Sequence, residues 1–140
     1  MKEIISHREF MPVEKENNIF FTGGESGNDF PNLLNAARKA VAHRYRVFIL
    51  PNPKGIRTAD FVLERIGVIG LYDLKTIQGK ASVSNRLNES IGQTNRVLLN
   101  MTTDYNARLL ASDIKNFFEK SKEAIEVLVF KGNKTISIKR

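Results

Sequence analysis

The alternation of hydrophobic and polar positions along the chain predicts helices and strands in a mixed order. Apolar residues at helical spacing predict helices at about 31–43, 82–93 and 105–120. Short apolar runs bounded by turn residues predict strands at 45–50, 60–64, 68–75, 96–101, 125–130 and 135–138. The resulting order, αβββαβαββ, indicates an α/β (α+β) fold with a single mixed β-sheet flanked by helices.

The apolar pattern is weak before this region. Residues 1–30 are expected to form a weakly structured N-terminal segment, and residues 31–140 a single domain without repeats or an internal boundary. Within the segment, Ile19-Phe20-Phe21-Thr22 favours a short strand, whereas residues 23–29 have the composition of a loop. Asn28 or Asp29 is positioned to cap the first helix, which is entered through Pro31.

Composition narrows the class of protein. The 140 residues are 41% hydrophobic and 26% charged, as in a soluble globular domain, and no apolar run is long enough to cross a bilayer. Charge enters directly after Met1, so no signal-peptide pattern is present. The absence of cysteine excludes disulfides, thiolate metal sites and cysteine nucleophiles, and is compatible with a reducing compartment.

The charge is strongly positive and unevenly distributed. The net charge is +7 and the pI is near 9.8. No acidic residue occurs from Pro31 to Ala59, a span that contains Arg38, Lys39, Arg44, Arg46, Lys54 and Arg57. A basic surface of this kind favours a polyanionic partner such as a nucleic acid, although a basic protein with no such partner has the same composition.

The strands at 60–64 and 68–75 carry the best candidates for chemistry. They are joined by a tight turn containing glycine, so a hairpin can bring Asp60 close to Asp73. Because side chains alternate along a strand, Asp73 and Lys75 point to the same face. Two carboxylates and a lysine can hold a divalent cation and a phosphate ester, with Asp60 and Asp73 as the metal ligands. The alternative is a surface ion pair without chemistry.

The helix expected at 82–93 has two distinct faces. Val83, Leu87 and Ile91 form its apolar stripe, and Ser82, Asn85, Arg86, Glu89 and Gln93 form the opposite polar face. Such a face is often only solvated, but Ser82, Asn85, Arg86 and Gln93 could hold a substrate, together with Thr76, Gln78 and Lys80 before the helix. The next helix offers Leu109, Leu110, Ile114, Phe117 and Phe118 to the core.

Other residue types carry weaker signals. Histidine is the usual acid–base catalyst, but His7 lies in the weakly patterned segment, and the position of His43 near a helix C-terminus explains its presence by the helix dipole. Tyr72 and Tyr105 are the best candidates for stacking on bases, although core positions account for both. The glycines at 23–27 lack the spacing of a nucleotide-binding loop.

The order of elements and these residues resemble the C-terminal nuclease domains of contact-dependent growth inhibition toxins, whose fold is similar to the PD-(D/E)xK restriction-endonuclease class. The resemblance covers residues 31–140. In it, Asp60 matches the first acid of the class, Asp73 the second and Lys75 the lysine. The following run is also similar to such toxin domains and to related phage and mobile-element nucleases: Lys75-Thr76, Ser82, Asn85, Gln93 and Arg96-Val97-Leu98-Leu99.

The resemblance implies a catalytic set of Asp60, Asp73 and Lys75, with Mg²⁺ as the cofactor. It implies cleavage of RNA, with tRNA as the leading substrate. It further implies action in the bacterial cytoplasm, after delivery as part of a larger secreted or phage-borne protein. By charge complementarity, an acidic immunity protein is the expected partner.

One departure from the class leaves the chemistry open. Members of the class often place a glutamate on the first helix as a further metal ligand, and the corresponding residue here is Asn35. An amide brings no charge, so Mg²⁺ would bind less tightly. A metal-independent ribonuclease of the barnase, EndoU and colicin group is therefore an alternative. The closest rival to a ribonuclease is a DNA endonuclease of the same fold, and a non-catalytic basic module that binds nucleic acid is a further alternative, which Asn35 favours. The sequence does not indicate an oligomeric state.

Overall fold

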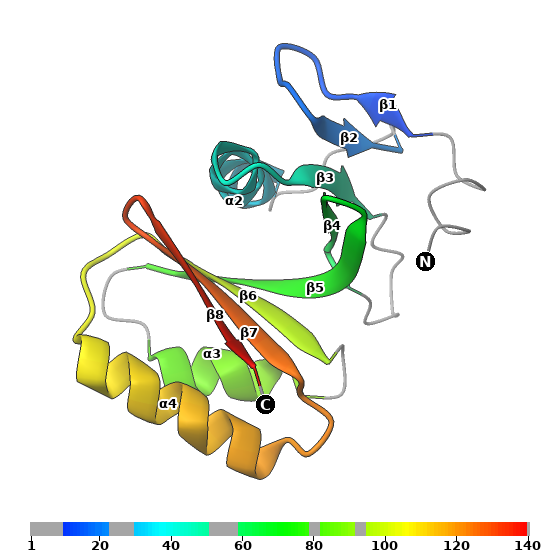
Figure 1. Ribbon diagram of the computed structural model, residues 1–140. Coiled ribbons are helices and arrows are strands. Elements are labelled where there is room, and N and C mark those ends of the chain that lie inside the picture. The colour runs from blue at the N-terminus through cyan, green and yellow to red at the C-terminus, as the bar shows by residue number, and fades with distance from the viewer. Residues whose placement is uncertain (1–9, 23–29, 51–58, 79–81, 92–94, 140) are drawn as a thin grey trace. The chain divides into compact units, whose positions relative to one another are not determined.

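The computed structural model describes residues 10–22, 30–50, 59–78, 82–91 and 95–139. The chain divides into two compact units, one ending at Tyr72 and the other beginning at Asp73. The strand β5 (Val68–Ile77) contributes its first half to one unit and its second half to the other. The strands pair in the order β1 to β8, with parallel and antiparallel neighbours, as expected of a mixed α/β fold (Figure 1).

The first unit contains one described helix and five strand segments. Besides Val68–Tyr72 of β5, these elements are β1 (Met11–Pro12), β2 (Ile19–Phe21), α2 (Phe30–Ala42), β3 (Arg46–Ile49) and β4 (Phe61–Arg65). Strands β2 and β3 are parallel, and the other neighbouring strands of this unit are antiparallel. The helix α2 packs on β3 through fully buried alanines, whose small side chains allow the helix to approach the strand closely: Ala36, Ala37 and Ala40.

The predicted hairpin at 60–75 is present. Strands β4 and β5 pair from Phe61 with Tyr72 to Arg65 with Val68, around the two-residue turn Ile66–Gly67. Both turn residues have positive φ, 53° and 77°, which is the geometry that twists a two-residue hairpin correctly. A β-branched residue seldom adopts this geometry, and Ile66 does so with its side chain 93% exposed.

The second unit consists of two β-α-β crossovers and a closing hairpin. Its elements, besides Asp73–Ile77 of β5, are α3 (Val83–Glu89), β6 (Arg96–Met101), α4 (Ala107–Lys120), β7 (Glu126–Lys131) and β8 (Lys134–Lys139). Strands β5, β6 and β7 are parallel and β8 is antiparallel. The helices α3 and α4 lie side by side (Figure 1) and share one hydrophobic core with the sheet. No described helix is long and apolar enough to span a membrane.

From Phe30 onward the order of elements is αβββαβαββ, which confirms the predicted fold class. Two details of the prediction are wrong. The helix α3 ends at Glu89, with Ser90 as its C-cap, so Ile91 lies beyond the helix and is exposed rather than part of the apolar stripe. On α4, Leu109 is 49% exposed, because the buried face runs through Leu110 and Ile114.

A polar residue explains why the core face of α4 was hard to locate. Asp113 is buried on that face beside Leu110, Ile114 and Phe117. Its carboxylate accepts a hydrogen bond from the Tyr105 hydroxyl at 2.8 Å, which offsets the cost of burying it. The N-cap of the helix is Asn106, whose side chain accepts hydrogen bonds from the N–H groups of Arg108 and Leu109.

Candidate functional site

Asp73 and Lys75 form a buried ion pair on β5. Their side chains point to the face of the sheet that α3 and α4 cover, because Asp73 is in register with Val97 and Lys75 with Leu99, two residues of the shared core. The Lys75 Nζ atom lies 3.5 Å from Asp73 Oδ2, and the two side chains are only 11% and 4% exposed. The alternation of the strand therefore places the acid and the amine side by side, as the sequence predicts.

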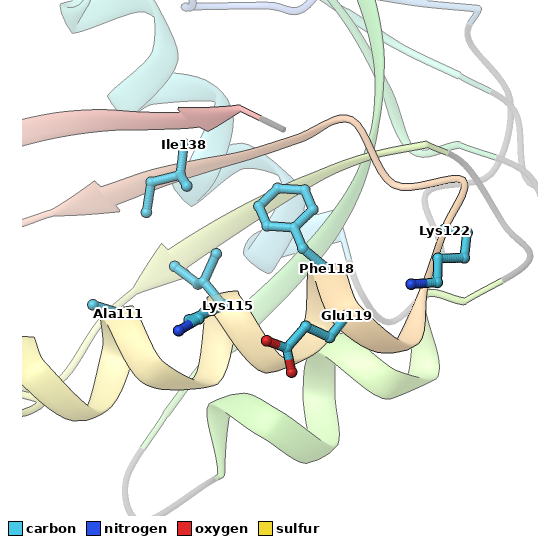
Figure 2. Close-up of a pocket in the computed structure, with 7 residues that line it drawn as sticks. Ala111, Lys115, Phe118, Glu119, Lys122 and Ile138 are labelled. Carbon is cyan, nitrogen blue, oxygen red and sulfur yellow. The ribbon is translucent and has the colours of Figure 1, made fainter.

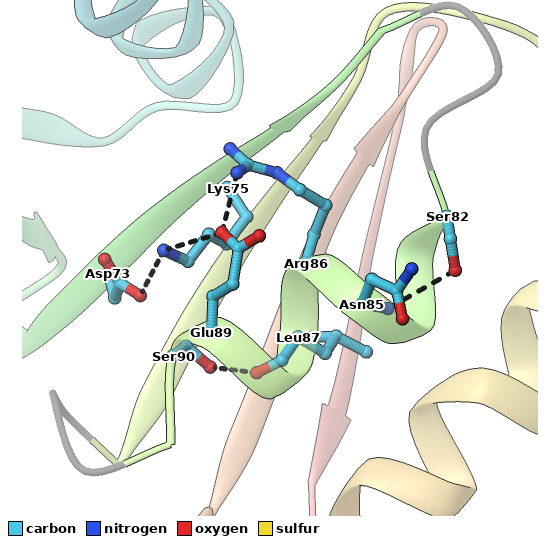
Figure 3. Close-up of polar contacts among 8 residues, drawn as sticks. All are labelled: Asp73, Lys75, Ser82, Asn85, Arg86, Leu87, Glu89 and Ser90. Atoms are coloured by element: carbon cyan, nitrogen blue, oxygen red, sulfur yellow. Dashed lines mark hydrogen bonds and ion pairs between the residues drawn. The ribbon is translucent and has the colours of Figure 1, made fainter.

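The helix α3 adds a second, more exposed ion pair to the first. Glu89 Oε2 lies 2.7 Å from Arg86 Nη1 and 3.9 Å from Lys75 Nζ. Figure 3 shows the four side chains in a chain of contacts, from Asp73 through Lys75 and Glu89 to Arg86. We call Asp73, Lys75, Arg86 and Glu89 the charged cluster; exposure increases from the strand, where Asp73 is 4% exposed, to the helix, where Glu89 is 48% exposed.

The charges of the cluster determine what it can bind. The Lys75 ammonium is held between two carboxylates, and Arg86 lies beyond one of them. Removing Lys75 would take from the buried Asp73 carboxylate the cation that lies 3.5 Å away, and removing one partner of a buried ion pair is strongly destabilising. An anionic ligand that approaches from the exposed side can contact both Lys75 and Arg86, because the exposed Arg86–Glu89 pair is weaker than the buried pair.

The donor set is compatible with a hard divalent cation. Mg²⁺ is commonly held by only one or two carboxylates, with waters and substrate phosphates completing its coordination. Asp73 supplies a carboxylate of this kind, and the chain has no cysteine that would favour a softer metal. Among the described residues, no three His, Cys, Asp or Glu side chains are grouped as a preformed metal cage.

Asp60, the other predicted carboxylate, belongs to the first unit. It lies directly before β4 and is half-buried. Its backbone N–H donates a hydrogen bond of 2.9 Å to the carbonyl of Tyr72, the residue that precedes Asp73 in the chain. Its role as a metal ligand stays a prediction from the sequence.

The predicted substrate-binding residues differ in where they lie. Lys80 and Gln93 lie outside the described residues. Thr76 is half-buried on β5, next to Lys75 and therefore on the opposite face of the strand. Ser82 and Asn85 are exposed at the start of α3 (Figure 3). The Ser82 hydroxyl accepts the N–H of Asn85 at 3.3 Å, so Ser82 has a structural role as the N-cap of α3.

Glu89 was not among the predicted site residues. The sequence placed it on the polar face of the helix but gave no sign that it reaches Lys75, because that contact depends on how α3 crosses β5. The signal available was its spacing, since Arg86 and Glu89 are three residues apart and therefore neighbours on one face of a helix.

The tyrosines and the described histidine make no visible contribution to the cluster. Tyr72 is buried in the core and is therefore unsuited to stacking on a base. The Tyr105 hydroxyl donates a hydrogen bond to Asp113. Burial is the larger cause, and this hydrogen bond the next, of a pKa of Tyr105 raised above its ordinary value. His43 lies just beyond the C-terminus of α2, as expected, and His7 lies outside the described residues.

A second surface feature lies between α4 and β8. It is a groove of about 490 Å³ (Figure 2). Apolar side chains of α4 and β8 line it together with charged side chains of α4 and of the residues just after that helix: Ala111, Ile114, Phe118 and Ile138, with Lys115, Glu119 and Lys122. The sequence does not predict this groove, because it depends on the packing of α4 against the last strand.

The fold and the charged cluster define an α/β domain that carries an acid–lysine pair on a sheet strand. Residues 57–136, more than half of the chain, match the family model described as the contact-dependent growth inhibition CdiA C-terminal domain. The chain therefore belongs to the CdiA C-terminal domain family. The matched region includes Asp60 and all four residues of the charged cluster.

The fold is also similar to a solved structure. A chain of the CdiA-CT/CdiI toxin and immunity complex from Burkholderia pseudomallei superposes with a TM-score of 0.52 at 16% sequence identity. The match covers 86% of this chain and 98% of that one. At this identity the likeness concerns the fold. No curated relative matches the sequence.

Proposed function

We propose that this domain is a toxin nuclease that cleaves RNA phosphodiester bonds, with tRNA as the leading substrate. The observation that carries the proposal is the buried Asp73–Lys75 ion pair, 3.5 Å apart, in a chain of the CdiA C-terminal domain family. The net charge of +7 supports a polyanionic substrate. The solved neighbour is itself described as a toxin, which supports the same assignment.

The chemistry follows from the charges of the cluster. A water oxygen attacks the phosphorus atom and loses a proton to the solvent, while the bond from phosphorus to the leaving oxygen breaks and that oxygen takes up a proton. The Lys75 ammonium stabilises the negative charge that develops on the phosphoryl oxygens, and Asp73 holds that ammonium in place. If Mg²⁺ is used, Asp73 and the predicted ligand Asp60 would hold it, and the metal would supply Lewis-acid activation of water.

A metal-free variant uses the same lysine. In RNA the 2′-hydroxyl can attack the adjacent phosphate, and Lys75 would then stabilise the pentacovalent intermediate. Asn35 favours this variant, or a non-catalytic module, over a strongly metal-dependent enzyme. It lies exposed on α2, where related nucleases often carry a glutamate.

An immunity protein is the partner we propose. The solved neighbour forms a toxin and immunity complex. Because this chain carries a net charge of +7, a partner with an acidic surface is expected by complementarity. In this proposal the domain is the toxic end of a larger protein and acts in the cytoplasm of a target bacterium.

The test incubates the purified protein with total tRNA, ribosomal RNA and plasmid DNA, each with Mg²⁺ or with EDTA. Asp73→Asn is the inactive control, because it keeps the shape of the side chain and removes its charge. Discrete tRNA fragments that need Mg²⁺ and Asp73 would support the proposal. Cleavage of tRNA that survives EDTA would assign the metal-free variant.

The remaining outcomes contradict the proposal. Cleavage of plasmid alone would make the protein a DNA endonuclease. Salt-sensitive binding of nucleic acid without any cleavage would make it a binding module. Circular dichroism of both proteins establishes that the control variant is folded.

A further inference from the structure

Glu89 is an acidic residue in a position that does not favour one. It is the last residue of α3, and the C-terminal end of a helix carries partial negative charge that disfavours a carboxylate. It is held there by two cations from different elements, Arg86 of α3 at 2.7 Å and Lys75 of β5 at 3.9 Å. Two cations converging on a single anion are the arrangement with which proteins bind phosphate.

The Glu89 contacts are also the ones in the charged cluster most easily exchanged. The Glu89 and Arg86 side chains are 48% and 35% exposed, whereas Lys75 is 11% exposed and is fixed from its other side by Asp73. An exposed ion pair contributes little to stability, because water solvates both partners well when they separate. An anion from solution can therefore replace the Glu89 carboxylate without disturbing the buried pair.

We propose that the Glu89 carboxylate occupies the position of a substrate phosphate, and that a backbone phosphate of the nucleic acid displaces it to bind between Lys75 and Arg86. This inference rests on the proposed function in taking nucleic acid as the ligand. Glu89 then competes with the substrate: it weakens binding and takes no part in the chemistry. Neutralising Glu89 should therefore tighten the binding of tRNA and lower KM.

The competing interpretation predicts the opposite effect. Asp73 and Glu89 both contact the Lys75 ammonium, so Glu89 could instead be a second carboxylate that the site needs for a cation or for the position of Lys75. In that case neutralising Glu89 would reduce cleavage. The direction of the effect of a single substitution separates the two interpretations.

The experiment compares Glu89→Gln with the wild-type full chain. We measure KM and kcat for tRNA cleavage at several NaCl concentrations, and tRNA binding by fluorescence anisotropy. Glu89→Gln should lower KM and Kd by about 3- to 10-fold and leave kcat within a factor of about two.

Two matched variants control the result. Glu119→Gln neutralises an exposed carboxylate on α4 and should leave tRNA binding unchanged, because Glu119 lines the groove and not the cluster. In an Arg86→Gln background the gain from Glu89→Gln should largely disappear, because the phosphate position has lost one of its two cations. Circular dichroism verifies that each variant is folded.

Failure of the phosphate position can be told apart from failure of the proposed function. A loss of kcat in Glu89→Gln, unchanged tRNA binding, or an equal gain in Glu119→Gln would each overturn the phosphate position. If the wild-type protein cleaves nothing, the proposed function fails, but tighter tRNA binding by Glu89→Gln would still support the phosphate position. Absence of tRNA binding by both proteins would overturn it.

Discussion

The second unit is built alike at its two ends, β5 and β8, but the side chains at these ends differ in charge. Two rows of side chains cross the sheet on the face that the helices cover. One runs from Asp73 through Val97 and Val127 to Ile138, and the other runs from Lys75 through Leu99 and Val129 to Ile136. Each row therefore begins with a charged residue on β5 and ends with an isoleucine on β8.

A different helix covers each of these two ends. At the β5 end, α3 supplies Arg86 and Glu89 to the charged cluster. At the β8 end, Phe118 of α4 and Ile138 of β8 line the groove, together with charged side chains of α4 and of the residues after it. The two ends therefore differ in the two charged residues that begin otherwise apolar rows, and in the helix that covers them.

The largest expected effect tests whether chemistry is confined to the β5 end. Asp73→Asn should reduce tRNA cleavage by at least about 100-fold, because the variant loses the charge that holds Lys75 and any cation. Asp113→Asn is the matched control, since Asp113 is a buried aspartate of α4 that lies outside the charged cluster and accepts a hydrogen bond from Tyr105. It should retain the cleavage rate per folded molecule. Equal losses in both variants would show that the effect is not specific to the charged cluster.

A core substitution should separate stability from chemistry. Ile114 is fully buried between α4 and the sheet, so Ile114→Ala removes apolar contacts and leaves a cavity. We expect it to lower the free energy of unfolding by about 2–5 kcal/mol. Urea denaturation measures the loss. Cleavage per folded molecule should be unchanged, and a specific loss of kcat would show that the α4 side contributes to catalysis.

The surface cations of the two helices should differ in what they bind. Arg86→Gln should weaken tRNA binding several-fold and lower the salt slope by about one, because it removes a phosphate contact. Lys115→Gln, which neutralises a cation of the groove, should change binding by less than about twofold. Anisotropy titrations at several salt concentrations measure both. An equal slope change in the two variants would indicate a diffuse basic surface rather than a defined site.

The smallest expected effect concerns the hydrogen bond between Tyr105 and Asp113 of α4. Tyr105→Phe removes the hydrogen bond to Asp113 and should lower the free energy of unfolding by about 1 kcal/mol at neutral pH. Because the pKa of Tyr105 is raised in the folded state, its contribution is fully present below the ordinary tyrosine pKa near 10.0 and is lost as pH rises through the folded value.

Urea denaturation at several pH values tests this dependence. The difference between wild type and Tyr105→Phe should be constant from pH 7 to about 9 and shrink above pH 10. A difference that grows with pH would contradict the assignment. The charged cluster should be unaffected, so cleavage at neutral pH should not change.

The sequence predicted what depends on local periodicity. Strand alternation placed Asp73 and Lys75 on one face, and the turn at Ile66–Gly67 identified the hairpin. The phase of α4 was less accessible, because its buried face includes Asp113 and excludes Leu109. Asp113 looks like a solvent residue until its partner Tyr105 is known.

Contacts between elements were the part that could not be predicted. The approach of Glu89 to Lys75 depends on the crossing of α3 over β5, which no spacing in the sequence specifies. Ser82 shows the converse. A serine directly before a helix is a common N-cap, so its structural role was available from local sequence beside the proposed substrate role.

The two kinds of strand pairing in β5 have a consequence for the order of folding. Its first half pairs with β4 across a two-residue turn, whereas Asp73–Ile77 pairs with residues of β6 that lie 24 positions further along the chain, so this pairing requires a long crossover to close. The β7–β8 hairpin is equally local. Both hairpins can thus form early, and Asp73 and Lys75 gain their neighbours in one of the slower steps. A partly folded chain would possess these two hairpins before it possesses the charged cluster, so the onset of any activity should lag behind the first recovery of strand structure during refolding.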